Sequence, residues 1–382
     1  MRTRNWLFQA MTVTAIFIAA GPACDNGPGQ PNPPTPGETF TAADGTRFGV
    51  QVIATNLEVP WGLAFTPDGR LFFTERTGRV RVFQGGRVLP EPALVLTDIA
   101  ATGEAGGLGI AMHPQFAENH FVYLVYTYQR PGGGIGNRVV RYRELNNTLA
   151  EGVVLVDEIP GANIHDGGRT RFGPDGKLYV TMGDAASENL AQDLGSFAGK
   201  ILRMNDDGSR PADNPFPSLI YSYGHRNPQG IDWHPATGEL WGTEHGSSGN
   251  DELNRIVAGG NYGWPTIEGS QSAPGLLPPV LSYSPAVAPS GGSFYTGNAI
   301  PSFRFNFFFA TLRGLHLHRV RFDPANPRQV GTEERLLVNR FGRIRDVVTG
   351  PDGMLYFCTS NRDGRGAPTP DDDRIVRIVP AP

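Results

Sequence analysis

Short apolar segments separated by polar turns recur along most of the chain. Five copies share one pattern, in which an apolar strand, a proline-containing turn and a second apolar strand follow one another; the turn prolines are Pro67, Pro114, Pro174, Pro235 and Pro351. They recur at intervals of about 50 to 60 residues, and the last interval is about twice as long. We therefore expect a sixth, less regular copy in the gap, with strands near 291–295 and 305–312.

Six copies of a multi-strand unit at this period are typical of a β-propeller. The predicted fold is therefore all-β, a six-bladed β-propeller over residues 41–382. A final apolar strand at 373–379 is available to close the ring by pairing with a strand from the other end of the chain. A β-sandwich would show turn signals at shorter spacing, and no long segment of the body has the periodicity of an amphipathic helix.

The first residues have the pattern of an export signal. Arg2 and Arg4 precede an apolar run over 11–20. This run is too short to span a membrane as a helix and has the flanks of a signal peptide. We therefore predict a signal peptide over 1–23 and an exported protein, located in the periplasm or the cell envelope.

The two cysteines have different expected roles. A small residue precedes Cys24, as in bacterial lipoprotein cleavage sites, but Gly21 stands where leucine is usual. Whether Cys24 carries a lipid anchor or the leader is simply cleaved nearby stays open. Residues 24–40 are rich in Pro, Gly and Asn and predict a flexible tether. Cys358 lies inside a strand pattern, which favours packing in the core over chemistry.

The charge pattern excludes one class of partner and suggests another. The formal net charge is −4 and no basic run occurs, so nothing indicates binding to nucleic acid. Lys177 and Lys200 are the two lysines of the chain, and the other basic residues are arginines. A GC-rich genome would explain their total number, whereas the planar fork of donors on arginine also suits the binding of carboxylates.

A histidine and an aspartate are expected to meet at the end of one hairpin. His165 precedes an apolar strand, 174–176 is a tight-turn signal, and Asp184 follows the partner strand. Antiparallel pairing brings the two outer ends of such a hairpin together. An imidazole beside a carboxylate suits a general base that an acid holds in one tautomer. The alternative is a surface histidine beside a capping aspartate.

Other polar groups stand at the ends of predicted strands. They are Arg226 and Asn227 in the loop 223–230, the Gly-rich and oxygen-rich loop 244–265, Arg313 after an aromatic strand, and Arg343 and Arg345, which alternate onto one face. Each one alone would be read as a solvated loop. In a propeller, however, the loops of one rim converge on the central channel. Together they suit a multiply charged anion beside a cation, and the loop 244–265 has the oxygen donors that calcium requires.

Several motifs make the chain similar to a known family. They are VPWGLAFTPDGRLFFTER, the block from His165 to Asp184, YGHRNPQG, DELN with GGNYGWP, GRIRDVVTGPDG and TSNRDGRG, which occur in this order within 50–379. The chain resembles the soluble quinoprotein sugar dehydrogenases, that is, the glucose/sorbosone dehydrogenase family, and within it the bacterial aldose sugar dehydrogenases. The resemblance implies a six-bladed propeller that binds pyrroloquinoline quinone (PQQ) and calcium and oxidises the C1 hydroxyl of aldoses to lactones.

The resemblance also implies roles for individual residues. His165 would be the general base and Asp184 would orient it. The PQQ-binding residues would be Arg226, Asn227, Arg313, Arg343 and Arg345. Calcium would bind the backbone carbonyls of Gly246 and Ser247, and a calcium site described for the aldose enzymes would involve Glu252 and Tyr262. The partners would be a small-molecule sugar and an external electron acceptor, neither of which the sequence identifies.

One position departs from the family. Glu104 stands where the family carries a glutamine that contacts PQQ, and a carboxylate there would repel an anionic cofactor or need to be protonated. Two other classes of function compete with this one, namely a non-catalytic propeller that binds a partner or carbohydrate, and a calcium-dependent lactone hydrolase. The former has no need of His165, Asp184 and several arginines, and the latter would place carboxylates around a central metal.

Overall fold

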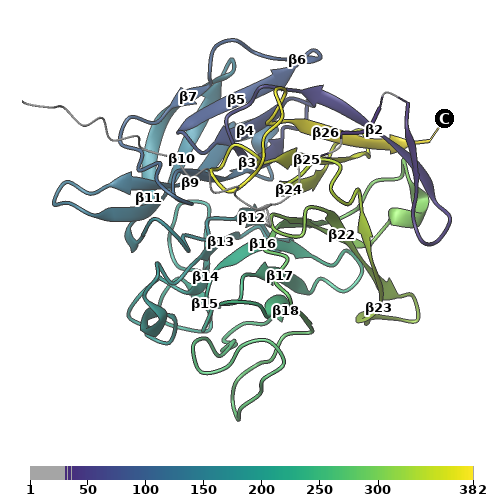
Figure 1. The fold of residues 1–382 in the computed structure, drawn as a ribbon. Helices are drawn as coiled ribbons and strands as arrows, with labels where there is room; N and C mark the ends of the chain where they lie inside the picture. The colour runs from purple at the N-terminus through teal and green to yellow at the C-terminus, as the bar shows by residue number, and fades with distance from the viewer. Residues whose placement is uncertain (1–30, 32, 36, 382) are drawn as a thin grey trace, which may run out of the picture.

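The chain forms a ring of six antiparallel β-sheets. The structure is a computed structural model that describes residues 31, 33–35 and 37–381. Figure 1 shows the sheets arranged around a common centre, so the predicted all-β, six-bladed propeller is confirmed. The predicted signal peptide and Cys24 lie outside the described residues. Among the described residues, no helix has the length and apolarity needed to cross a membrane.

Blades 1 to 3 follow the chain in order. Blade 1 consists of β3 (Pro60–Phe65), β4 (Leu71–Glu75), β5 (Arg79–Gln84) and β6 (Arg87–Val88), with β7 (Leu94–Val95) also paired with β5. Blade 2 consists of β8 (Gly107–Met112), β9 (Phe121–Gln129), β10 (Ile135–Leu145) and β11 (Thr148–Pro160). Blade 3 consists of β12 (Thr170–Phe172), β13 (Leu178–Met182), β14 (Lys200–Met204) and β15 (Ile220–Tyr223).

The remaining blades include the closure of the ring. Blade 4 consists of β16 (Pro228–Trp233), β17 (Leu240–Glu244), β18 (Asp251–Ile256) and β19 (Leu281–Tyr283). Blade 5 consists of β20 (Pro289–Phe294), β21 (Phe307–Thr311), β22 (Leu317–Asp323) and β23 (Asn326–Leu336). Blade 6 consists of β24 (Ile344–Thr349), β25 (Leu355–Thr359), β26 (Ile375–Pro380), β2 (Arg47–Ala54) and β1 (Thr39–Thr41).

Both expectations about irregular parts of the ring are confirmed. The sixth copy predicted between the regular repeats is the hairpin of β20 and β21. The last strand, β26, pairs antiparallel with β2, and Figure 1 shows these two strands side by side in yellow and purple. This pairing joins the two ends of the chain and closes the ring. Strand β1 overlaps the last two residues of the predicted tether.

Within the described part of the chain, helical structure is confined to single turns in the connections. They are α1 (Phe116–Asn119) and the 3-10 turns η1 (Glu188–Ala191) and η2 (Pro301–Phe303). The hairpin of β12 and β13 contains the predicted tight turn, where Gly176 has a φ of 72°. That left-handed conformation is free of strain for glycine because glycine lacks a Cβ atom.

The hydrophobic core is divided into six clusters, one between each pair of neighbouring blades. Successive side chains of a strand point to opposite faces of its sheet. Accordingly, Phe72 packs between blades 1 and 2, whereas Phe73 packs between blades 6 and 1. Because both faces of each blade are covered, strands such as β4 are buried throughout. Cys358 is fully buried in the cluster between blades 6 and 1, as predicted.

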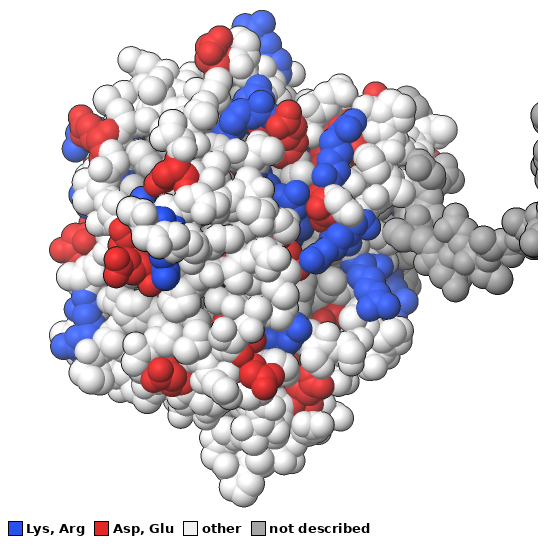
Figure 2. All heavy atoms as spheres, turned by 60° about the vertical axis from the view of Figure 1, so that its left-hand side comes forward, with Lys and Arg blue, Asp and Glu red and all other residues white. Residues whose placement is uncertain are grey.

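The surface carries charges of both signs. On the face shown in Figure 2, arginine and lysine side chains are interspersed with aspartate and glutamate side chains. That face carries no extended patch of a single sign.

Candidate active site

One rim of the ring collects most of the polar residues singled out from the sequence. One group precedes the innermost strand of a blade and the other follows the second strand. The first group is Glu104, His165, Arg226 and Arg343, and the second is Asp184, Gly246 and Arg313. The start of one antiparallel strand lies beside the end of its partner. Both groups therefore reach the same rim.

The Asp184 carboxylate holds the His165 imidazole. Nδ1 of His165 lies 2.8 Å from Oδ1 of Asp184, so the predicted meeting of the two side chains is confirmed. Asp184 is buried and accepts two more hydrogen bonds at 2.9 Å, from the N–H of Ala186 and from Nε1–H of Trp264. An ionised carboxylate only accepts hydrogen bonds. We therefore assign the ring proton of neutral His165 to Nδ1, which leaves the lone pair on Nε2.

The backbone around His165 is constrained on several sides. His165 has a φ of 61°, in a region that residues other than glycine seldom adopt. Its N–H donates to Oε2 of Glu104 at 3.2 Å, and its carbonyl accepts the N–H of Ala185 at 3.2 Å. A Cβ atom at Gly183 would clash with the same carbonyl. These contacts fix the direction in which the imidazole leaves the chain.

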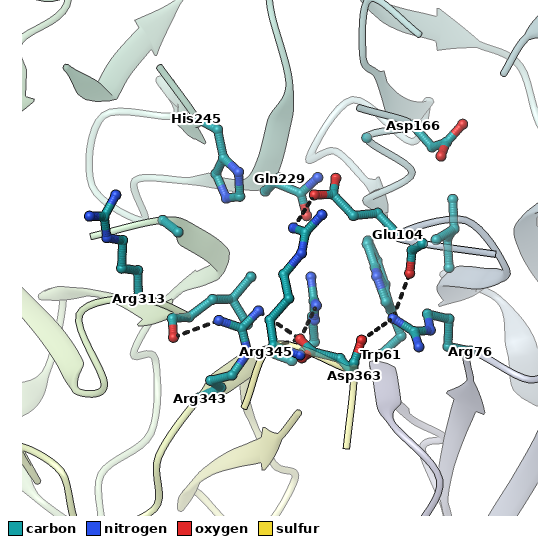
Figure 3. A pocket seen from close by; sticks show the side chains of 16 residues that line it. Trp61, Arg76, Glu104, Asp166, Gln229, His245, Arg313, Arg343, Arg345 and Asp363 are labelled. Carbon is teal, nitrogen blue, oxygen red and sulfur yellow. Dashed lines mark hydrogen bonds and ion pairs between the residues drawn. The ribbon is translucent and has the colours of Figure 1, made fainter. Parts of the chain in front are cut away.

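A cavity of about 200 Å³ opens at the centre of this rim. Its charged residues, most of which are labelled in Figure 3, are Arg76, Glu104, Asp166, Arg313, Arg343, Arg345, Asp363 and Arg365. Trp61, Leu108 and Leu312 provide apolar wall. The cavity therefore brings together three of the predicted arginines, which come from blades 5 and 6.

Asp363 binds two of these arginines. Its Oδ2 lies 2.6 Å from Nη2 of Arg343 and 3.3 Å from Nη2 of Arg345. Burial would raise the pKa of Asp363, but the charges of Arg343 and Arg345 outweigh it and lower that pKa. Burial lowers the pKa of Arg345 to about 10, which leaves it charged near neutrality. Arg313 is exposed, and its guanidinium has no ion-pair or hydrogen-bond partner among the described residues.

The charge balance of the cavity favours an anionic ligand. Burial would raise the pKa of Glu104, but neighbouring positive charges and hydrogen bonds lower it to about 2. Five arginines therefore face two ionised carboxylates, Glu104 and Asp363, and the excess is three positive charges. Asp166, whose pKa burial raises to about 7, contributes at most one further negative charge. A ligand with several carboxylates would neutralise this excess.

Arg226 and Asn227 lie beside the cavity and do not line it. Asn227 is fully buried, and its Oδ1 accepts Nε2–H of Gln229 at 3.0 Å. Arg226 donates from Nη1 to the carbonyl of Gly246 at 2.5 Å. Two buried donor atoms, Nδ2 of Asn227 and Nε of Arg226, have no hydrogen-bond partner among the described residues.

A second cavity, of about 10 Å³, adjoins the first through His245. That volume holds about one water-sized particle. Its wall carries oxygen atoms from Glu244, Gly246, Glu252, Tyr262 and Glu268. Burial, and next the charge of Glu244, raises the pKa of Glu252 to about 8. A buried carboxyl that is short of positive charge is suited to a hard cation such as calcium.

The residues predicted to bind calcium come together only in part. Gly246, Glu252 and Tyr262 line the small cavity, whereas Ser247 does not. The Tyr262 hydroxyl accepts a backbone N–H at 2.9 Å and donates to a backbone carbonyl at 2.6 Å, so only the Tyr262 carbonyl could serve as a ligand. The Gly246 carbonyl is taken by Arg226. Across the residues that the structure describes, no cluster of three or more His, Cys, Asp or Glu is placed to hold a metal ion.

Comparison with known proteins decides the family. The sequence matches the family described as glucose/sorbosone dehydrogenase over residues 57–373. The chain belongs to this family. It is a family of oxidoreductases, so the resemblance inferred from the motifs is confirmed.

Individual relatives match over nearly their whole length. Aldose sugar dehydrogenase YliI from Escherichia coli (strain K12) is 33% identical over 340 residues, which cover 82% of this chain and 91% of that protein. Quinoprotein glucose dehydrogenase B from Acinetobacter calcoaceticus is 29% identical, with 92% of each chain covered. The PQQ-bound aldose sugar dehydrogenase from Streptomyces coelicolor is a solved structure with 36% identity and a TM-score of 0.78, which covers 87% of this chain and 98% of that one.

The site of this family member includes residues that the sequence analysis did not single out. Trp264 lies in the GGNYGWP motif, and Asp363 and Arg365 lie in TSNRDGRG, but no role was assigned to them. Arg76 ends the motif VPWGLAFTPDGRLFFTER and His245 lies in the loop 244–265, but no role was assigned to them, because their neighbourhood is created only when distant loops meet. The motif around Asp363 and Arg365, with its Arg-Asp-Gly-Arg run, was a further usable signal.

Proposed function

We propose that this chain is a PQQ- and calcium-dependent dehydrogenase that oxidises the C1 hydroxyl of aldose sugars to lactones. The observation that carries this proposal is the arginine-lined cavity, with an excess of two to three positive charges, whose lining residue Glu104 accepts the N–H of His165. Two relatives support it by name: an Escherichia coli aldose sugar dehydrogenase and a PQQ-bound Streptomyces coelicolor enzyme.

The donor set suits PQQ, which carries three carboxylates. Arg313, Arg343 and Arg345 would hold these carboxylates in the cavity by charge-assisted hydrogen bonds. The unpartnered Nδ2 of Asn227 and Nε of Arg226 would supply further donors at its edge. When bound, PQQ supplies the two-electron acceptor that takes the hydride from C1 of the sugar.

His165 would act as the general base. Its Nε2 carries the lone pair and would accept the proton of the C1 hydroxyl. Asp184 would then stabilise the resulting imidazolium through the 2.8 Å hydrogen bond to Nδ1. The His165 side chain is 14% exposed and that of Asp184 is 2% exposed, so water screens this charge pair little.

Calcium would bind at the small cavity. Glu252 and the carbonyls of Gly246 and Tyr262 would be its ligands there, with the cation taking the place of the proton on Glu252. Arg226 would have to release the Gly246 carbonyl, which would free its guanidinium for the anionic cofactor. Ser247 stays a weaker candidate, because it does not line this cavity.

The cellular setting follows from the N-terminal pattern alone. Residues 1–23 support export to the periplasm or cell envelope. Electrons would leave to an external acceptor, and Cys24 is a candidate site for a lipid anchor.

Reconstitution of the purified apo-protein tests the proposal. The apo-protein is mixed with PQQ and calcium, and dye reduction is followed with a panel of aldoses. We expect turnover that requires both PQQ and calcium. PQQ binding without turnover on any aldose would refute the substrate assignment. Absence of PQQ binding would refute the proposal and favour a non-catalytic binding propeller.

The proposed binding site has a matched control. Replacing Arg343 and Arg345 together by Gln should weaken PQQ binding by about 100-fold or more, since hydrogen bonds to charged groups contribute about 1.5–3 kcal/mol each. Arg141 and Arg143 have the same spacing on β10, outside the cavity, and the same double replacement there should leave the affinity unchanged. Equal affinities for the two double variants would refute the site.

A further inference from the structure

Glu104 and Arg365 form an ion pair at the edge of the main cavity. Oε1 of Glu104 lies 2.5 Å from Nη1 of Arg365, and the side chains are 20% and 56% exposed. Glu104 lies between β7 and β8, and Arg365 lies between β25 and β26, so the contact joins the first blades to the last. The other carboxylate oxygen, Oε2, accepts the N–H of His165 at 3.2 Å. The position of Glu104 over the cavity is visible in Figure 3.

Among the described residues, Arg365 is the one that forms an ion pair with Glu104. The causes that lower the pKa of Glu104 against its burial are the charge of His245 and the hydrogen bonds from Arg365 and the backbone of His165. Together these interactions outweigh burial and lower the pKa of Glu104 to about 2, so the carboxylate that pairs with Arg365 is ionised. Of the two alternatives that the sequence left open, repulsion of an anionic cofactor or protonation of Glu104, the lowered pKa favours an ionised Glu104.

We propose that Arg365 is a further cofactor-site residue whose charge cancels that of Glu104, so that the pair presents a neutral, hydrogen-bonding edge to an anionic ligand. This inference rests on the proposed binding of PQQ. Without Arg365, an ionised carboxylate would face a trianion across a partly dry cavity, where charges of like sign repel strongly. If both charges are removed, by replacing Glu104 and Arg365 with glutamine, the amide at position 104 does not repel the anionic ligand.

A set of variants separates charge cancellation from a simple contact. The variants are Arg365→Gln, Arg365→Lys, Glu104→Gln, the double variant Glu104→Gln/Arg365→Gln, and Arg143→Gln as a control. Arg143 also forms an exposed ion pair, with Glu151 at 3.2 Å, but on β10 outside the cavity. The dissociation constant of PQQ is measured by quenching of tryptophan fluorescence in the apo-protein, since Trp61 lines the cavity. Thermal unfolding checks that each variant is folded.

The expected order of affinities is specific to charge cancellation. Arg365→Gln should bind PQQ about tenfold more weakly than the wild type, or worse. Arg365→Lys keeps the charge and should bind within about threefold of the wild type. The double variant should recover most of the affinity lost in Arg365→Gln, and Glu104→Gln alone should bind at least as tightly as the wild type. Arg143→Gln should bind like the wild type.

Several outcomes overturn the inference. If Arg365→Gln binds PQQ as tightly as the wild type does, Arg365 has no role in binding. Equally weak binding in Arg365→Gln and in the double variant would show that the Glu104 carboxylate is not the cause of the loss. In both cases the wild type still binds PQQ and the proposed function stands. A wild type that binds no PQQ overturns the proposed function, and this inference with it.

Discussion

Replacing Asp184 by Asn probes the hydrogen bonds that orient His165. Asp184 accepts from His165 and Ala186 at Oδ1 and from Trp264 at Oδ2. An asparagine accepts only at Oδ1, so its NH₂ group must face one of these donors. If the NH₂ group faces Trp264, His165 keeps its proton on Nδ1. If it faces His165, the proton must move to Nε2, where it blocks the general base.

The geometry sets the size of both effects. Either orientation of the asparagine leaves at least one buried N–H without an acceptor, that of Trp264 or that of Ala186. A buried unpaired donor costs about 1–3 kcal/mol, so the free energy of unfolding should fall by that amount. The charge that stabilises the His165 imidazolium is also lost. Turnover should therefore fall by about 10²- to 10⁴-fold, the scale of general base catalysis, while PQQ affinity changes little.

A double-mutant cycle checks the argument. In a Trp264→Phe background the donor at Oδ2 is gone, so asparagine can place its Oδ1 on His165 and Ala186, and only its own NH₂ group is left without an acceptor. Urea unfolding should then show a smaller cost of Asp184→Asn than in the wild type, because no Trp264 N–H loses its acceptor, and the difference is a coupling of up to about 1–3 kcal/mol. Turnover of the double variant should be at least that of Asp184→Asn. Additive losses of stability, or near-normal turnover of Asp184→Asn, would refute the reasoning.

Three other predictions follow from buried charges. Asp346 pairs with Arg169 at 2.8 Å, both almost fully buried, so Asp346→Ala should lower the free energy of unfolding in urea by about 3–5 kcal/mol. Burial raises the pKa of Asp166 from 3.8 to about 7, so between these values the folded protein keeps a proton that the unfolded chain loses. The free energy of unfolding should therefore fall as the pH rises from about 4 to 7. Urea titrations at several pH values should show this fall in the wild type and a flatter dependence in Asp166→Asn. Chelation of calcium should lower the melting temperature of the wild type and leave that of Glu252→Gln unchanged.

Local patterns account for what the sequence predicted correctly. His165 and Asp184 are 19 residues apart and belong to one hairpin, so antiparallel pairing alone brings them together. The number of blades followed from the repeat period, and the sixth copy from its place in that period. Arg343 and Arg345 share one face because side chains of a strand alternate. None of these inferences needed knowledge of distant contacts.

The sequence by itself therefore determined the architecture, the hairpin that carries the histidine, and the arginine-rich character of the site. Only the tertiary structure decided which charges meet. Closing the ring pairs Glu104 with Arg365 across 261 residues, and the packing of blade 4 against blade 3 brings Trp264 to Asp184 across 80 residues. It also separates Arg226 and Asn227 from the cavity that holds the other arginines. The physical reason is that a propeller brings together loops whose distance in sequence does not indicate their distance in space. The ionisation of a side chain depends on the charges that lie near it in space, so it cannot be predicted before the loops are placed.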